Sequence, residues 1–447
     1  MTTPRNPLLG LKATFRTLGC KLNFAETSAL ADRLKAEGVS EAAPGEAADL
    51  CVVNTCSVTD TADSKGRQTI HRLVREHPSA FVVVMGCYAQ LKPDEVARLE
   101  GVDLVVGTEQ KARIIDLVKQ GLLKRQTMDD GHNLHEAVAT PMRDIRTFVP
   151  SCSRGNRTRY FLKVQDGCNY FCTYCTIPAA RGRSRNGSIA MLADQARRAA
   201  DAGAKEIVLT GVNIGDYGRS TGEDLLSLLR ELDTVEGIER YRISSIEPNL
   251  LTEPIIEFCA QSRAFMPHFH IPLQCGNDEV LRLMRRRYTT ELFASRVERI
   301  HALMPDAFIG VDVIVGMRGE TDSLFEQAYA FIKELDVSQL HVFNYSERPG
   351  TKALQIPHKV SPAERQSRSR RLIELSERKR LAFYRRHIGQ TRPVLWEQSA
   401  IGAPMHGFTD NYIRIELPEA RTDLDNQISM VRLGSLTPDQ QSLIAAE

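Results

Sequence analysis

Three cysteines lie within eight residues of this sequence, and their spacing constrains the chain more than any other feature. The stretch is Cys168-Asn169-Tyr170-Phe171-Cys172-Thr173-Tyr174-Cys175, a C-x3-C-x2-C pattern. Three thiolates this close together can bind one metal centre, and soft sulfur ligands favour iron–sulfur clusters or zinc. A structural zinc site needs four protein ligands, and no fourth cysteine or histidine follows within the next thirty residues. An iron–sulfur cube with one iron left open therefore fits better than zinc. Three neighbouring core thiols are the plainer alternative.

This spacing is similar to that of the radical S-adenosylmethionine (SAM) enzymes, and Tyr174 before the last cysteine matches their pattern. The resemblance implies that Cys168, Cys172 and Cys175 hold a [4Fe–4S] cluster. Its open iron is expected to accept the amino and carboxylate groups of SAM.

Length and composition indicate a globular protein of two or three domains. The chain has 447 residues, of which 42% are hydrophobic and 26% charged, as in ordinary soluble proteins. Ten unevenly spaced cysteines indicate metal or redox chemistry in a reducing compartment rather than a disulfide scaffold. The first residues lack the apolar segment of a signal peptide, and no run approaches the roughly 20 apolar residues that span a bilayer. We therefore expect a cytoplasmic protein with no membrane partner.

Residues 1–130 alternate between short apolar stretches and amphipathic ones, which predicts a parallel α/β sheet. Strands are expected at residues 13–18, 50–53, 81–85 and 103–106, and helices at 23–37, 59–76, 93–99 and up to Gly121. Cys20, Cys56 and Cys87 follow the first three of these strands. The carboxyl ends of parallel strands share one edge, where α/β sheets bind ligands. Gly19 and Gly86 precede two of the cysteines and allow close approach of the backbone. A second three-cysteine site is predicted here, with chance placement as the alternative.

Residues 158–385 contain six strand–helix units, which predict an open, partial (β/α)6 barrel with its site at the C-terminal strand ends. The strands are expected at 160–164, 206–209, 241–244, 268–271, 308–315 and 340–343. Tyr174 is predicted to line the SAM pocket. So are the residues that follow the strands, Gly211, Asn213, Glu247, Gln274 and Gly316, although each of these is also an ordinary loop residue. His268 and His270 share one face of a strand. Without a third ligand in view, a hydrogen-bonded position is favoured over a metal site.

The remaining segments are basic or rich in turns. Residues 131–157 are expected to form an exposed linker, and its arginines, with Arg181, Arg183 and Arg185, either line an RNA approach or form a solvated surface. The stretch from Arg365 to Arg392 is strongly basic and is expected to attract phosphates. Short strands at 391–398, 407–417 and 427–433 predict a small β-barrel over residues 386–447. Phe408, Asn411 and Tyr412 would contact a loop base there, unless they only stabilise the barrel.

Together these pieces resemble the tRNA methylthiotransferase family, over nearly the whole chain. The six cysteines appear in the family's order. The other matching segments are Thr17–Asn23, Asn54–Cys56, Met85–Tyr88, Thr210–Gly215, His270–Gln274, Asp312–Gly316 and Tyr345–Thr351. The resemblance implies an N-terminal methylthiotransferase domain, a radical SAM core and a TRAM-like RNA-binding barrel. It also implies two [4Fe–4S] clusters, one on Cys168, Cys172 and Cys175 and one on Cys20, Cys56 and Cys87.

The same resemblance implies a reaction. The first cluster reduces SAM to a 5′-deoxyadenosyl radical, which takes hydrogen from C2 of an adenine, and the second presents a methylated sulfur for insertion at that carbon. The opening Gly19-Cys20-Lys21-Leu22-Asn23 and the segment Asn54–Thr59 resemble the branch acting on N6-threonylcarbamoyladenosine at position 37, in the tRNA anticodon loop. The branches acting on isopentenyladenosine or on a ribosomal-protein aspartate are alternatives, as is a non-catalytic RNA-binding protein with structural metal sites. An electron donor such as flavodoxin or ferredoxin and a sulfur donor would be partners.

Overall fold

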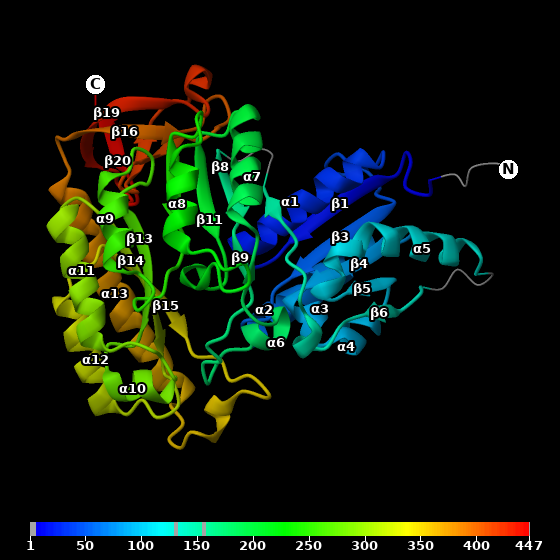
Figure 1. The fold of residues 1–447 in the computed structure, drawn as a ribbon, viewed down its shortest axis with the longest axis horizontal. Coiled ribbons are helices and arrows are strands. Elements are labelled where there is room, and N and C mark those ends of the chain that lie inside the picture. The colour runs from blue at the N-terminus through cyan, green and yellow to red at the C-terminus, as the bar shows by residue number, and fades with distance from the viewer. Residues whose placement is uncertain (1–5, 129–132, 154–157, 447) are drawn as a thin grey trace.

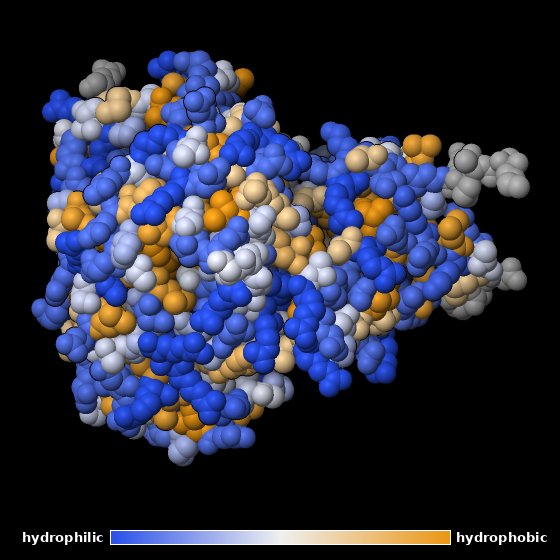
Figure 2. Space-filling view, viewed as in Figure 1, coloured by the Kyte–Doolittle hydropathy of each residue, from blue (hydrophilic) through white to orange (hydrophobic). Residues whose placement is uncertain are grey.

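The computed structural model describes residues 6–128, 133–153 and 158–446, which form three parts. Figure 1 shows a first α/β domain on one side, a larger α/β core beside it, and a small β-barrel at one end of the core. The face shown in Figure 2 is largely hydrophilic, and its apolar side chains form small separate patches. Among the described residues, no helix has the length and apolar character needed to cross a membrane.

The first domain is a parallel sheet covered by helices on both faces, as the alternating pattern predicted. Its strands lie in the order β2-β1-β3-β4-β5-β6. They are β1 (Lys12–Thr17), β2 (Ser40–Glu41), β3 (Leu50–Thr55), β4 (Phe81–Gly86), β5 (Leu104–Val106) and β6 (Glu136–Val138). The helices are α1 (Lys21–Ala36), α2 (Asp60–Glu76), α3 (Cys87–Leu91), α4 (Pro93–Ala97) and α5 (Ile114–Gln126). Every residue of β3 and β4 is buried, because helices cover both faces of a parallel sheet.

The segment expected to be a linker is partly structured. β6 pairs with β5 and extends the first sheet beyond residue 130. The short strand β7 (Ser151–Cys152) pairs with the first long strand of the core. Each pairing satisfies backbone groups that an exposed loop would leave to water. The expected boundary at residue 130 is therefore too early.

The core is the predicted partial barrel of six parallel strands. They are β8 (Arg159–Lys163), β11 (Glu206–Thr210), β12 (Arg240–Ile243), β13 (His268–Gln274), β14 (Phe308–Val315) and β15 (Gln339–Asn344). β8, β11 and β12 form one sheet and β13, β14 and β15 another, and a bridge from Tyr241 to Phe265 lies between them. Leu162, Ile207 and Val311 belong to the large apolar cluster under the outer helices. Residues at alternate positions therefore face the inside of the barrel.

Helices cover the outside of this barrel, and short elements surround its open end. The outer helices are α7 (Ile189–Asp201), α8 (Leu225–Asp233), α9 (Glu253–Gln261), α11 (Thr290–Leu303), α12 (Asp322–Glu334) and α13 (Pro362–Arg386). The short elements include β9 (Gln165–Asp166), β10 (Arg185–Asn186), α6 (Ile177–Arg181) and α10 (Asp278–Leu283). α13 begins with a capping box between Ser361 and Glu364, which satisfies two N-terminal amides of the helix.

The C-terminal strands close into a five-stranded barrel, β16-β17-β18-β20-β19. They are β16 (Thr391–Trp396), β17 (Met405–Thr409), β18 (Arg414–Leu417), β19 (Ile428–Leu436) and β20 (Leu443–Ala446). The prediction of one strand over residues 407–417 is wrong, because Tyr412 has φ 69° and the chain turns there between β17 and β18. The barrel docks against the N-terminal ends of the core strands, where Arg240 and Arg242 donate to backbone carbonyls of residues 408–410.

Several of the basic side chains predicted to attract phosphates serve the fold instead. Arg368 is buried and pairs with Glu320 at 2.9 Å. Arg380 is also buried and donates to the carbonyl of Gln440, and Arg392 pairs with Asp306 of the core at 2.9 Å. These guanidinium groups hold α13 and the barrel to the core. The prediction of a basic RNA-binding face is therefore wrong for them.

The three residues expected to contact an RNA base lie at the junction between barrel and core. Asn411 is fully buried and donates to the carbonyl of Asp306. Tyr412 lies against the rings of His268 and Phe408, with ring-centroid distances of 4.4 and 4.9 Å. The guanidinium of Arg159 stacks on Phe408 at 4.6 Å. Their aromatic and polar groups are used inside the protein, so the expectation of stacking on an RNA base is wrong.

Candidate metal centres and the cavity between them

The first group of cysteines lies on the loop after β9, beyond the carboxyl end of β8. Gly167 has φ 71°, and a Cβ there would lie 2.1 Å from the carbonyl oxygen of Arg183, so only glycine fits this turn. Each of the three sulfurs accepts an N–H. Tyr170 donates to Cys168 at 3.4 Å, Arg286 to Cys172 at 3.2 Å, and Ile177 to Cys175 at 3.4 Å.

Burial affects the ionisation of all three of these thiols. Burial, and secondarily the neighbouring thiols, raise the pKa of Cys168 to about 11 and that of Cys175 to about 12. Burial also raises the pKa of Cys172. All three are free thiols, and a metal ligand must be a thiolate. A cluster would supply the missing positive charge, and N–H donors to the sulfurs are the contacts that adjust cluster potentials.

The second group of cysteines is assembled from three strands of the first domain. β1, β3 and β4 are neighbours in the sheet, and Cys20, Cys56 and Cys87 follow their carboxyl ends closely. Burial raises the pKa of Cys56 to about 11, with further contributions from the thiols of Cys87 and Cys20. The three sulfurs thus share one electrostatic environment. This is the arrangement that the strand order predicts, and the donor set suits the same kind of cluster.

Two glycines make this second group possible. Gly19 has φ 103°, and a Cβ there would lie 2.8 Å from Cβ of Cys56. Gly86 has φ 102°, and a Cβ there would lie 2.3 Å from the carbonyl oxygen of Thr55. Side chains at these positions would push the cysteine loops apart, so the glycines let the strand ends approach one another.

A buried ionic network joins the first domain to the core beside the two groups. Arg181 donates to Asn23 at 2.6 Å and to Glu26 and Asp166 at 3.0 Å each. Lys111, Lys163 and Arg185 complete the network. Although burial opposes it, these cations hold the pKa of Glu26 and that of Asp166 well below the usual carboxyl range. The expectation that Arg181 and Arg185 line an RNA approach is therefore wrong.

This network was not predicted from the sequence. Its one sequence signal is Glu26, an acidic residue placed between Leu22 and Leu30 on the apolar side of a helical pattern. A charge at such a position is expected to have a buried partner.

The two cysteine loops meet at the junction between domain and core. The hydroxyl of Thr176, next to Cys175, donates to the carbonyl of Ser57, next to Cys56, at 3.5 Å. Arg348 donates to the Ser57 hydroxyl at 2.9 Å and to Asp63 at 2.8 Å. Arg348 thus holds the Cys56 loop against the core. This contact gives the segment Tyr345–Thr351, which contains Arg348, a role at the junction between the first domain and the core.

A cavity of about 240 Å³ opens between these loops. Val58 and Thr59 line it from the first domain. The core contributes the predicted residues Tyr174, Cys175 and Gln274, together with Thr176, Ile177, Asp312, Ile314, Phe343, Asn344, Tyr345 and Ser346. One cavity therefore reaches Cys175 of the first group and the loop that carries Cys56 of the second.

Two predicted pocket residues carry polar atoms without a partner. Both side-chain atoms of the buried Asn213, and Oε1 of Gln274, form no hydrogen bond within the described part of the chain. Burying such groups unpaired is costly, so they fit a site completed by a polar ligand such as SAM. Gly211 packs beside Gln165, whose Oε1 accepts the amides of Val212 and Asn213 at 2.9 and 2.8 Å.

Glu247 and Gly316, the other two residues predicted to line the SAM pocket, lie in different surroundings. Glu247 forms an ion pair with Arg286, the residue that also donates to Cys172, and burial raises the pKa of Glu247. Gly316 has φ 77°, its amide donates to Glu320 at 2.7 Å, and a Cβ there would meet Arg365 of α13. The structure therefore brings Glu247 to the first cysteine group, whereas Gly316 packs toward α13. Arg286 was not predicted.

Of the two histidines on β13, His270 has the expected hydrogen-bonded position, whereas Nδ1 of His268 has no hydrogen-bond partner within the described residues. His270 has two possible co-ligands for a metal ion, Asp312 on β14 and His341 on β15. One ligand atom of each of these three residues lies within 4.8 Å of the other two. Nε2 of His270 lies 2.7 Å from Oδ1 of Asp312. His268 is not part of this group and stacks on Phe308, with a ring-centroid distance of 5.5 Å.

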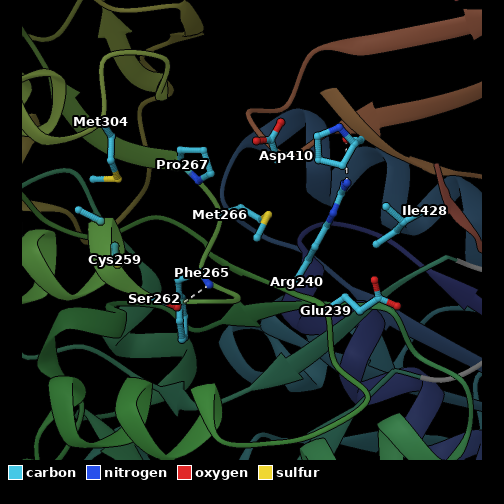
Figure 3. A pocket seen from close by; sticks show the side chains of 12 residues that line it. Glu239, Arg240, Cys259, Ser262, Phe265, Met266, Pro267, Met304, Asp410 and Ile428 are labelled. Carbon is cyan, nitrogen blue, oxygen red and sulfur yellow. Dashed lines mark hydrogen bonds between the residues drawn. The ribbon is translucent and has the colours of Figure 1, made fainter. Parts of the chain in front are cut away.

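A larger cavity of about 390 Å³ lies at the other end of the core strands, against the C-terminal barrel. Figure 3 shows it between Met266 and Pro267 of the core and Asp410 and Ile428 of the barrel, with Arg240 reaching across. None of the six clustered cysteines lines it. We regard it as a gap between docked domains.

The partial barrel and its C-x3-C-x2-C loop define a radical SAM enzyme, and residues 162–332 match the family model "Radical SAM superfamily". Residues 12–107 match "Uncharacterized protein family UPF0004". The solved structure of the radical SAM methyltransferase TsrM from Kitasatospora setae shares the fold, with a TM-score of 0.56 at 17% identity over 77% of each chain.

Curated relatives identify the family more closely. The chain is 40% identical to threonylcarbamoyladenosine tRNA methylthiotransferase MtaB of Bacillus subtilis (strain 168), over 90% of this chain and 89% of that protein. It is 36% identical to MtaB of Aquifex aeolicus (strain VF5), over 91% and 96%. A tRNA-2-methylthio-N(6)-dimethylallyladenosine synthase of Novosphingobium aromaticivorans is 35% identical, over 86% and 87%. The chain belongs to the tRNA methylthiotransferase family of radical SAM enzymes.

Proposed function

We propose that this protein methylthiolates C2 of N6-threonylcarbamoyladenosine at position 37 of tRNA, giving the 2-methylthio derivative. The observation that carries the proposal is the cavity between the two cysteine groups, bounded by Cys175 on one side and by the residues after Cys56 on the other. One nucleotide would enter this cavity between the two cysteine groups. The similarity to proteins named MtaB supports the threonylcarbamoyl substrate over the dimethylallyl one.

Each group of residues has a role in this reaction. Cys168, Cys172 and Cys175 would hold one [4Fe–4S] cluster, and Cys20, Cys56 and Cys87 the other. When bound, these cofactors and SAM supply radical hydrogen abstraction and a sulfur for transfer. Asn213 and Gln274 offer unpaired polar groups to SAM, and Glu247 with Arg286 orients the first cluster site. Tyr174 and Tyr345 line the cavity and exclude water from it.

The partners follow from the substrate. The anticodon loop of tRNA enters between the first domain and the core, and residues 386–447 serve as the RNA-binding module through surfaces other than Phe408 and Tyr412. Reduction of the first cluster requires an electron donor such as flavodoxin or ferredoxin, and repeated turnover requires a sulfur donor. A cytoplasmic location suits these partners.

The test uses anaerobically reconstituted protein, SAM, a reductant and an anticodon stem-loop RNA carrying N6-threonylcarbamoyladenosine at position 37. Mass spectrometry of digested RNA should detect the 2-methylthio nucleoside, and an otherwise identical RNA with isopentenyladenosine should give little product. In a deletion strain, bulk tRNA should lack 2-methylthio-N6-threonylcarbamoyladenosine. A normal level of that nucleoside in the strain would refute the assignment.

A further inference from the structure

Three side chains that can bind a metal ion, and that belong to neither cysteine group, meet inside the core barrel. His270, Asp312 and His341 lie on the neighbouring strands β13, β14 and β15, with one ligand atom of each within 4.8 Å of the other two. His341 is beside Asp312 in the strand register, and His270 is beside Gly310, two residues before Asp312 on the same face of β14. The pairing of three strands therefore holds this group together.

A hydrogen bond accounts for two members of the group and leaves the third unexplained. Nε2 of His270 lies 2.7 Å from Oδ1 of Asp312. The described residues offer no hydrogen bond to the ring of His341, which lies beside the ring of His270 with centroids 5.1 Å apart. A Cβ on Gly310 would lie 3.5 Å from Nε2 of His341, and glycine inside a strand often marks a place where a ligand approaches closely. The missing side chain leaves space next to a nitrogen that has no other partner.

The group can be reached from the cavity between the cysteine groups. Asp312 lines that cavity together with Ile314 and Phe343, the next inward-facing residues of β14 and β15. The side chains of His270 and Asp312 are 22% and 20% exposed, so water and small ions can reach their ligand atoms. An ion held by this group would therefore border the cavity.

We propose that His270, Asp312 and His341 form a metal site that takes a divalent transition-metal ion such as Zn²⁺. Two imidazoles and one carboxylate are typical ligands of zinc and of non-haem iron. Ligand atoms bound to one Zn²⁺ at about 2.0–2.1 Å lie at most about 4.2 Å apart, so small rotations of these side chains would complete the set. Three protein ligands leave a fourth position for water or for an oxygen of a molecule in the cavity. This site goes beyond the proposed function and does not depend on it.

The test measures zinc binding by the full chain after both clusters have been loaded anaerobically. Iron analysis should first give about eight irons per chain, so that the six clustered cysteines are occupied. Zinc chloride is then added, the protein is desalted, and bound zinc is measured by inductively coupled plasma mass spectrometry. Wild type should retain about one zinc per chain, and X-ray absorption at the zinc edge should show nitrogen and oxygen ligands at about 2.0–2.2 Å. A sulfur shell at about 2.3 Å would place the zinc on cysteines and overturn the site.

Substitution of the ligands separates this site from other histidines. His341→Gln removes a ring that has no hydrogen bond in the described part of the chain, so the variant should keep its fold and its iron. Its Kd for Zn²⁺, measured by competition with a fluorescent indicator, should rise by at least the roughly 10–100-fold that loss of an outer-shell partner costs. Asp312→Asn should weaken binding in the same way.

The control is His301→Gln on α11, because Nε2 of His301 lies 2.9 Å from the carbonyl oxygen of Asp336, outside the barrel. This variant should bind zinc like wild type. Wild type that retains no zinc, or a His341→Gln variant with normal iron and an unchanged Kd, would overturn the site. RNA is absent from these measurements, so their outcome is separate from that of the methylthiolation assay.

Discussion

The two cysteine groups offer the same three thiols to a metal but are built in different ways. Cys168, Cys172 and Cys175 come from one loop, so their proximity is fixed by chain connectivity. Cys20, Cys56 and Cys87 are far apart in sequence and meet only because β1, β3 and β4 are adjacent in the sheet. The first site depends on local backbone geometry, whereas the second depends on the whole first domain being folded and docked.

The largest difference between the groups is expected from removing one thiol of each. Cys87→Ala should lower bound iron from about eight to about four per chain, since each cube holds four. It should still cleave SAM to 5′-deoxyadenosine but yield no methylthiolated RNA. Cys175→Ala should lose both activities. Iron analysis and mass spectrometry measure these outcomes, with Cys152→Ser as the control cysteine outside both groups. Normal methylthiolation by Cys87→Ala would contradict the proposal that the two groups have separate roles.

The contiguous group shows what sequence can predict about such a site. A C-x3-C-x2-C loop needs no tertiary information, and the strand–helix alternation was strong enough to place Cys20, Cys56 and Cys87 at one edge of a parallel sheet. The role of the glycines before two of these cysteines was also predictable. Gly19 and Gly86 adopt positive φ values, which allow the close approach that the loops require.

What sequence could not predict is where charged side chains find partners. The basic stretch from Arg365 to Arg392 was expected to face RNA, but Arg368 and Arg380 are buried. Charge alone does not tell a surface arginine from one that ties two elements together. Likewise, the group of His270, Asp312 and His341 depends on the register of three strands, which a sequence without pairing information does not contain.

A smaller effect is expected where the core holds the second group in place. Arg348 is buried and bonds both Ser57 and the buried Asp63. Arg348→Met would leave Asp63 without its main partner, and breaking a buried pair costs about 3–5 kcal/mol. We expect a lower free energy of unfolding in denaturant titrations, and a larger loss of sulfur transfer than of SAM cleavage.

The matched control is Arg371→Met, since Arg371 forms an exposed pair with Glu326 and such pairs contribute about 0–1 kcal/mol. Equal loss of the two activities in Arg348→Met would contradict a role specific to the Cys56 loop.

The smallest effect concerns the electronic environment of the first group. Arg286 donates to the Cys172 sulfur at 3.2 Å, and a hydrogen bond to a charged group contributes about 1.5–3 kcal/mol, roughly 60–130 mV for one electron. Arg286→Met should therefore make the first cluster harder to reduce by that amount, measured by redox titration in a Cys87→Ala background that lacks the second cluster. Arg287→Met is the control, because Arg287 stacks on Tyr170 at 4.1 Å and donates to the carbonyl of Asn169 without bonding a sulfur. Equal shifts in the two variants would show that general positive charge, not the bond to Cys172, sets the potential.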